Sequence, residues 1–318
     1  MINRYTLAAI AALVFAGCGG SQVAPTGGAM TASHAAHGKS WMLPEAKGEN
    51  LLYVSAGYVY VYRYGGRNKL VGHLNVYGNP DTLCSDTKGN VWVPVFKGIA
   101  YTGEVLEYAH GKTRPIERLK NVGAYPYGCA VDPTTGDLAV TNVCANYIPS
   151  CDGPGNVLIY KNGRGNPISR KDNSLGYYYY CAYDDSGNLY VDGTGRKHPT
   201  FHLAELPKGQ SKFNHIKLSV SPDNPGAIQW DGGDLAITDT KQIYEFSIEG
   251  ERGEEVGVTP LVGSDYVSQF WIDGKNVSVA DYKSESVGFY SYPAGGSPTK
   301  TFGTPYFPSG LAVSVTPR

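Results

Sequence analysis

Carboxylate and amide side chains recur at the ends of short apolar segments, where they could bind a ligand. The set is Asn142, Asp192, Asp239 and Asp281. Each follows an alternating or apolar run, such as Leu-Tyr-Val at 189–191. An Asn or Asp in this position can also accept hydrogen bonds from the backbone of its own turn. The pattern therefore leaves two interpretations open, a ligand-binding group and a turn-shaping group.

Tyrosines precede other short apolar segments and are expected at the same edge. In an antiparallel meander, the end of one strand lies beside the start of the strand before it. A tyrosine ring combines apolar area with a polar tip, which suits a binding surface. We predict that this surface contains Tyr125, Tyr127 and Tyr179 together with the carboxylates and amide above, and that Tyr266, Tyr306 and Phe307 reach the same edge.

Catalytic motifs are not found in the sequence. It lacks a Gly-x-Ser-x-Gly nucleophile turn, a His-Glu-x-x-His zinc motif and a phosphate-cradling glycine loop. His198 and His202 are four residues apart, but Pro199 argues against the helix that would bring them together. We therefore predict no catalytic residue, and the sequence favours a binding protein over an enzyme.

Cysteines point to an exported protein with at least one disulfide. Cys144 and Cys151 flank a long loop, and we predict that they pair. Cys129 and Cys181 occupy a position that is apolar in every other repeat, which predicts buried core residues. Cys84 is expected on the opposite face of its strand. At least one of these thiols must remain unpaired, because their number is odd.

A repeat organises the chain after residue 48. A turn ending in Asn or Asp precedes a short apolar strand six times, at intervals of 40 to 51 residues. The anchors are Asn50, Asn90, Asp137, Asn188, Asp234 and Asn276. A period in the forties without helical patterning predicts a β-propeller with one four-stranded blade per repeat. The first repeat lacks a leading strand and the segment 308–314 is left over, so we predict six blades closed by the C-terminal strand.

Two segments, 125–132 and 184–192, resemble NHL-type repeats. Such repeats build six-bladed propellers related to gluconolactonase-like folds, and the resemblance covers 49–318. It implies an alternative function, a hydrolase with a central divalent ion, calcium or zinc. Asn142, Asp192 and Asp239 resemble the candidate ligands. Apart from this alternative, no cofactor is expected.

The N-terminus predicts export and anchoring. Arg4 precedes an apolar run over 7–15 that is too short to span a membrane, and the run leads to Cys18. This segment resembles a bacterial lipoprotein signal peptide, in which the cysteine is lipidated. We predict a signal peptide over 1–18, a flexible tether over 19–48 and the propeller over 49–318.

Composition and net charge argue against nucleic acid as a partner. The net charge is −1, so no basic surface for nucleic acid is expected. The 41 glycines, 20 prolines and 25 tyrosines suit many short strands joined by turns. The resulting hypothesis is an extracytoplasmic propeller of the cell envelope, held at the membrane by its lipid anchor, that binds a protein, a peptide or a glycan.

Overall fold

The fold is known from a computed structural model, which describes residues 38–98, 102–122, 125–145, 151, 153–197 and 199–317. The predicted signal peptide, Cys18 and most of the predicted tether lie outside these residues. Two short 3-10 helices, η2 (Pro44–Gly48) and η4 (Lys161–Gly163), accompany the strands. Within this part of the chain, no helix has the length and apolarity needed to cross a membrane.

The first sheet joins the two ends of the described chain. Its strands, in spatial order, are β1 (Trp41–Met42), β4 (Leu70–Leu74), β3 (Tyr58–Arg63), β2 (Leu51–Ala56) and β26 (Gly310–Ser314). β26 pairs with β2 in antiparallel register from Leu51 opposite Ser314 to Ser55 opposite Gly310. The C-terminal strand therefore completes the first sheet, as the sequence predicts.

The remaining strands form four further sheets. The second contains β5 (Asn79–Pro80), β6 (Cys84–Ser85), β7 (Val91–Phe96), β8 (Thr102–Tyr108) and β9 (Pro115–Val122). The third contains β10 (Pro126–Val131), β11 (Leu138–Asn142), β12 (Asn156–Tyr160) and β13 (Ile168–Arg170). A later one contains β22 (Val267–Asp273), β23 (Asn276–Asp281), β24 (Ser286–Ser291) and β25 (Lys300–Gly303).

The fifth sheet has eight strands and consists of two antiparallel meanders. One is β14 (Tyr177–Tyr183), β15 (Leu189–Thr194), β16 (Phe201–Leu206) and β17 (Asn214–Leu218). The other is β18 (Ile228–Trp230), β19 (Leu235–Thr238), β20 (Gln242–Glu249) and β21 (Arg252–Pro260). A short parallel pairing of β17 with β21 joins the two outer strands.

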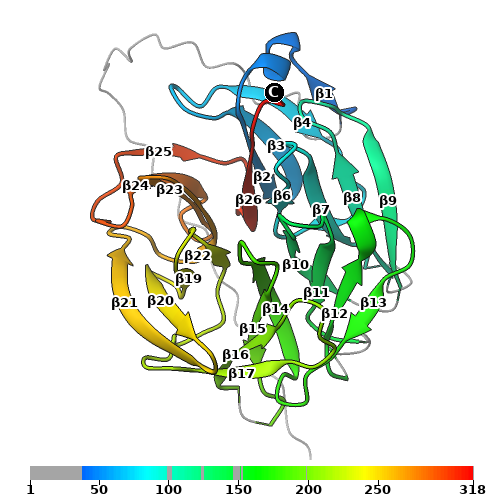
Figure 1. Ribbon diagram of the computed structural model, residues 1–318. Helices are drawn as coiled ribbons and strands as arrows, with labels where there is room; N and C mark the ends of the chain where they lie inside the picture. Colours follow the sequence, from blue (N-terminus) through cyan, green and yellow to red (C-terminus); the bar gives the residue numbers. More distant parts are fainter. Residues whose placement is uncertain are drawn as a thin grey trace, which may run out of the picture. The chain divides into compact units, whose positions relative to one another are not determined.

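The sheets surround a common centre, as Figure 1 shows. Their innermost strands contact one another in a closed circuit that runs β6, β10, β14, β18, β22, β26 and back to β6. The predicted all-β fold with a propeller-like arrangement is thereby confirmed. The start of each innermost strand faces one end of the central axis, because neighbouring strands run in the same sense around it.

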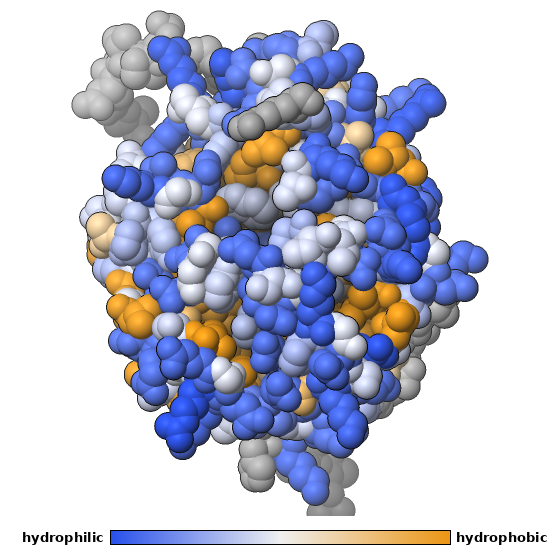
Figure 2. Space-filling model, in the orientation of Figure 1, coloured by the Kyte–Doolittle hydropathy of each residue, from blue (hydrophilic) through white to orange (hydrophobic). Residues whose placement is uncertain are grey.

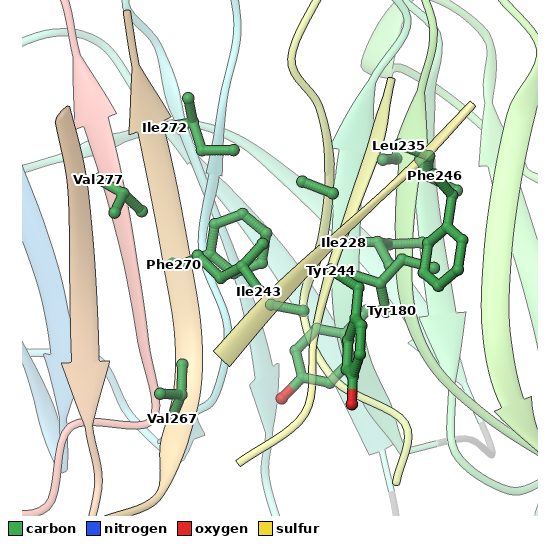
Figure 3. Packing of buried hydrophobic residues seen from close by; sticks show 14 of the residues in the cluster. Tyr180, Ile228, Leu235, Ile243, Tyr244, Phe246, Val267, Phe270, Ile272 and Val277 are labelled. Carbon is green, nitrogen blue, oxygen red and sulfur yellow. The ribbon is translucent and has the colours of Figure 1, made fainter. Parts of the chain in front are cut away.

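The core lies between adjacent sheets. In the cluster of Figure 3, Phe246 and Ile243 from β20 pack with Ile228 from β18, and Phe270 from β22 lies close by. All four side chains are buried. Each such side chain stabilises the fold by about 1.5–3 kcal/mol through removal of apolar surface from water. The apolar members of the alternating strands therefore fasten each sheet to its neighbours.

The compact unit that contains the sheets begins earlier than residue 49, where the sequence placed the start of the propeller. β1 pairs with β4, and the backbone N–H of Leu43 donates to the carbonyl of Val71 at 2.8 Å. Ala46 in η2 is fully buried in the core. The compact unit accordingly starts at Gly38. Turn-rich sequence with little apolar periodicity conceals this segment, because it adds only a two-residue edge strand.

Two disulfides join residues that the structure describes, and the sequence predicted one of them. Cys144 pairs with Cys151, which confirms the prediction for this loop. Cys84 pairs with Cys129, a pairing that the sequence left open, and Cys129 is buried, as predicted. The two residues lie on β6 and β10, adjacent innermost strands, with Cα atoms 5.7 Å apart. Cys181 is buried, as predicted, and its thiol is free.

The two disulfides should stabilise the fold unequally. Loop-closure entropy predicts a loss of about 4 kcal/mol for removal of Cys84–Cys129. The same estimate is about 2 kcal/mol for Cys144–Cys151, because its closed loop is much shorter. The sequence separations are 45 and 7 residues. Urea unfolding of the two paired Cys→Ser variants measures the difference, and equal losses would contradict it.

Candidate functional site

The predicted carboxylates and amide lie where expected, at the ends of second strands, but their side chains are buried. Asn142 ends β11, Asp192 lies in β15, Asp239 follows β19 and Asp281 ends β23. Their exposed fractions are 0%, 0%, 8% and 4%. Contact with a ligand would require that the loops above them move.

Hydrogen bonds account for the oxygen atoms of these side chains. Asp192 accepts from the backbone N–H groups of Tyr180 at 2.8 Å and Gly226 at 3.0 Å. Burial raises the pKa of this carboxyl well above its ordinary value, and the two N–H groups oppose that shift. Because Gly226 belongs to the segment before β18, Asp192 connects two neighbouring meanders.

Asp281, Asp239 and Asn142 follow the same pattern. Asp281 accepts from the N–H groups of Asp265 at 2.8 Å and Tyr266 at 3.1 Å. Asp239 accepts from the N–H of Lys241 at 2.9 Å, and the Asn142 amide bonds Asn121 at 2.6 Å and Asn156 at 2.8 Å. These contacts shape turns and join strands. A direct binding role for the four residues stays a prediction.

The predicted tyrosines do meet. Tyr127 lies between Tyr125 and Tyr179, with ring centroids at 6.3 and 5.8 Å. Its contact with Tyr179 is edge-to-face, a favourable arrangement for aromatic pairs. All three are half-buried. They lie at the starts of β10 and β14, next to the axis.

Tyr180 closes the axis at this end. Its hydroxyl donates to the backbone carbonyl of Ser268 at 2.6 Å and lies 3.2 Å from the hydroxyl of Tyr127. The contact therefore connects β14, β10 and β22. Burial raises the pKa values of Tyr180 and Tyr127, so both phenols remain protonated and able to donate. We call this contact the Tyr180 clasp.

Glutamines join the innermost strands below the clasp. Gln269 on β22 donates to the carbonyl of Leu83 at 2.7 Å and accepts from the N–H of Leu311 at 2.9 Å. Gln229 on β18 bonds both backbone groups of Ile272. An axial cavity of about 140 Å³ remains.

Asp81 lies beside the clasp, at the start of the second sheet. Its Oδ2 atom is buried and has no hydrogen-bond partner within the described residues. Burial raises the pKa of this carboxyl from 3.8 to about 7, and a hydrogen bond with Tyr125 opposes the shift. Sequence analysis did not select Asp81. The available signal was that an aspartate occupies a position where the neighbouring repeats have tyrosines, Tyr127 and Tyr179.

Exposed aromatic side chains form a ledge at the same end of the axis. Tyr282 stacks on Phe307 with centroids 4.9 Å apart, and Tyr266 lies 6.1 Å from Tyr282. Their exposed fractions are 41%, 48% and 43% in that order. Lys283 places its ammonium 6.0 Å from the Tyr266 ring. We call Tyr266, Tyr282 and Phe307 the aromatic ledge.

Sequence analysis placed Tyr266 and Phe307 at this edge but missed Tyr282. The available signal was its position directly after Asp281. Tyr306, also predicted here, is 46% exposed and packs near Gly57. Large aromatic side chains with this exposure, in contact with one another, are typical of interfaces.

The metal-dependent alternative does not fit the side chains. Within the described ranges, no three His, Cys, Asp or Glu side chains are grouped so that they could hold a metal ion. Asn142 and Asp192 already use their side-chain oxygens in the hydrogen bonds above. No hydrolytic step through a metal is therefore derived.

Comparison with known proteins identifies the fold. The sequence matches no protein-family model and no curated protein. By structure, 908 chains match. One, from a crystal structure of a nidogen/laminin complex, has a TM-score of 0.67 and 15% sequence identity. The match covers 85% of this chain and 99% of that chain. At this identity the likeness shows a β-propeller, a fold with many functions.

The Tyr180 clasp should contribute to stability. Tyr180→Phe removes the hydroxyl and leaves the Ser268 carbonyl without that donor, at a cost of about 1–3 kcal/mol. Tyr282→Phe, at an exposed position, should change stability by less than about 0.5 kcal/mol. Chemical denaturation of both variants tests this, and equal stabilities would contradict the clasp.

Asp81 should make stability depend on pH. Its carboxyl binds a proton more tightly in the folded state, so the folded state loses stability as pH rises from about 4 to about 7. The expected loss, relative to Asp81→Asn, is on the order of 2–4 kcal/mol for this half-buried group. Denaturation of both proteins across this range measures it, and parallel pH profiles would refute the assignment.

Proposed function

We propose that this protein is a six-bladed β-propeller that binds a partner protein through the aromatic ledge. The observation that carries the proposal is the contact of Tyr266, Tyr282 and Phe307 with one another while each remains more than two-fifths exposed. These rings are not buried in the core, so a partner that covers them would remove their apolar surface from water, which favours binding.

The count of six blades rests on the circuit of innermost strands. Dividing the eight-stranded sheet at its β17–β21 pairing gives two meanders, each with its own innermost strand. Six innermost strands then succeed one another around the axis. The proposed blades also correspond to the six repeats of the sequence.

A protein partner is favoured over a glycan by two features. The ledge is aromatic and holds one cation, Lys283, which matches the charge-poor centre of protein interfaces. The face seen in Figure 2 is mainly hydrophilic, and its hydrophobic residues form separate patches. A surface of this kind suits a partner that binds and leaves. The nidogen/laminin structure is likewise a complex of proteins.

The proposed location is the cell envelope, outside the cytoplasm. Two disulfides are consistent with an oxidising compartment. The proposed lipid anchor at Cys18 and the tether would hold the propeller at a membrane. Residues 38–48 belong to the compact unit, and we propose that the tether lies ahead of them.

Substitution of the ledge should abolish capture. The full chain with Tyr266, Tyr282 and Phe307 changed to Ala is compared with wild type in pull-downs from native envelopes. Proteins retained by wild type alone are then measured for affinity, where we expect a loss of about 30-fold or more. The change leaves the buried framework intact.

A matched control replaces three exposed apolar residues elsewhere. Ile116 on β9 and Val256 and Val258 on β21 are 53%, 56% and 37% exposed. Their change to Ala should leave capture intact. Equal capture by the ledge variant would overturn the proposal. If wild type retained a polysaccharide and no protein, the ligand of the ledge would be a glycan.

A further inference from the structure

A pocket of about 610 Å³, which shares no lining residue with the aromatic ledge, lies between two loops of the β14 meander. One loop, 171–176, leads from β13 into β14, and the other, 195–200, leads from β15 to β16. This volume is within the range of small-molecule sites. Its polar lining includes Asn173, Ser174 and Thr200.

Positive charge dominates the lining. Lys171, Arg196 and Lys197 all line the pocket, and the only acid among the lining residues is Asp172. The whole chain carries a net charge of −1, so this concentration is local. None of the three cations forms an ion pair with a described residue, whereas Arg63 and Arg164 do. Uncompensated like charges in one pocket attract an anion.

The carboxylate of Asp172 already contacts other residues, Ser174 and His215, and does not pair with the three cations. Its Oδ1 atom accepts from the N–H of Ser174 at 2.8 Å and lies 3.1 Å from Nε2 of His215. His202, which also lines the pocket, is neutral near pH 7, because burial and the nearby His215 lower its pKa. A neutral imidazole still donates one N–H to an oxygen ligand.

Arg196 passes close to the backbone of Gly176. A Cβ atom on Gly176 would lie 2.1 Å from Cγ of Arg196 and 2.9 Å from its Cα. Gly176 also donates its N–H to the carbonyl of Thr194 at 2.8 Å. The absent side chain therefore lets Arg196 lie over the loop at the pocket wall. A guanidinium can bind an oxyanion through two parallel hydrogen bonds.

We infer that this pocket binds the phosphate or sulfate group of a small polar ligand, at a second site independent of the ledge. Lys171, Arg196 and Lys197 supply the charge, and His202 supplies a neutral donor. An adjoining pocket of about 550 Å³ shares His202 and adds two cations, Lys217 and Arg252, and one acid, Glu251. A ligand larger than a free ion therefore has room next to the anion.

Titration calorimetry on the full chain tests the site with four probes: inorganic phosphate, inorganic sulfate, glucose 6-phosphate and glucose. We expect the three anions to bind and glucose not to bind. Stronger binding of glucose 6-phosphate than of phosphate would identify an ester ligand, and equal binding would identify the free ion. Lys171→Glu with Lys197→Glu should weaken anion binding by about tenfold or more.

The control reverses two exposed lysines elsewhere, Lys112→Glu with Lys275→Glu, and so changes the net charge equally. It should bind the anions like wild type. Equal weakening in both variants, full binding by the pocket variant, or no anion binding by wild type would each overturn the inference. Should the pocket variant fail to fold, Lys171→Gln with Lys197→Gln gives the same readout.

Discussion

The pairing of β26 with β2 is the constraint on which the molecule depends. Five residue pairs connect the C-terminal strand to the first sheet, and the N–H of Ser309 adds a bond to the carbonyl of Ser55. The pairing satisfies the inner edge of β2, which would otherwise expose unpaired N–H and C=O groups. It also places Ala312 in a core shared with the second sheet. Closure of the ring therefore depends both on backbone hydrogen bonds between β26 and β2 and on hydrophobic packing between the first and second sheets.

Closure brings the starts of the innermost strands together at the axis. Some backbone N–H and C=O groups there lack a partner within the sheets. The pairing of β10, β14 and β22 with their neighbours shifts register near these starts, so some backbone groups have no partner in the ladder. Side chains provide the missing partners. Thr141 donates to the carbonyl of Tyr179 at 2.6 Å, and Tyr180 and Gln269 reach further across. Side-chain hydrogen bonds therefore connect the innermost strands around an axial cavity of about 140 Å³.

Buried acids and exposed rings are two parts of the same arrangement at the ledge. Asp281 bonds the N–H of Tyr266 and, through its other contacts, the backbone and hydroxyl of Ser284. These segments carry Tyr266 and Tyr282. A buried carboxylate with several donors holds its loop in one conformation. Rings presented by a fixed loop lose little conformational entropy when a partner binds.

The sequence by itself determined the strand repeats, the closing role of residues 310–314, the Cys144–Cys151 pair and the edge at which tyrosines gather. These features depend on local alternation, turn residues and spacing, which a sequence displays directly. Only the tertiary structure decided that Cys84 meets Cys129 and that Tyr180 bonds Ser268. It also decided that Met42, Leu43 and Ala46 pack in or against the core, and that the recurrent acids point inward while Tyr282 points out. Each depends on the angle and register between neighbouring sheets, and one residue of register reverses the face on which a side chain lies.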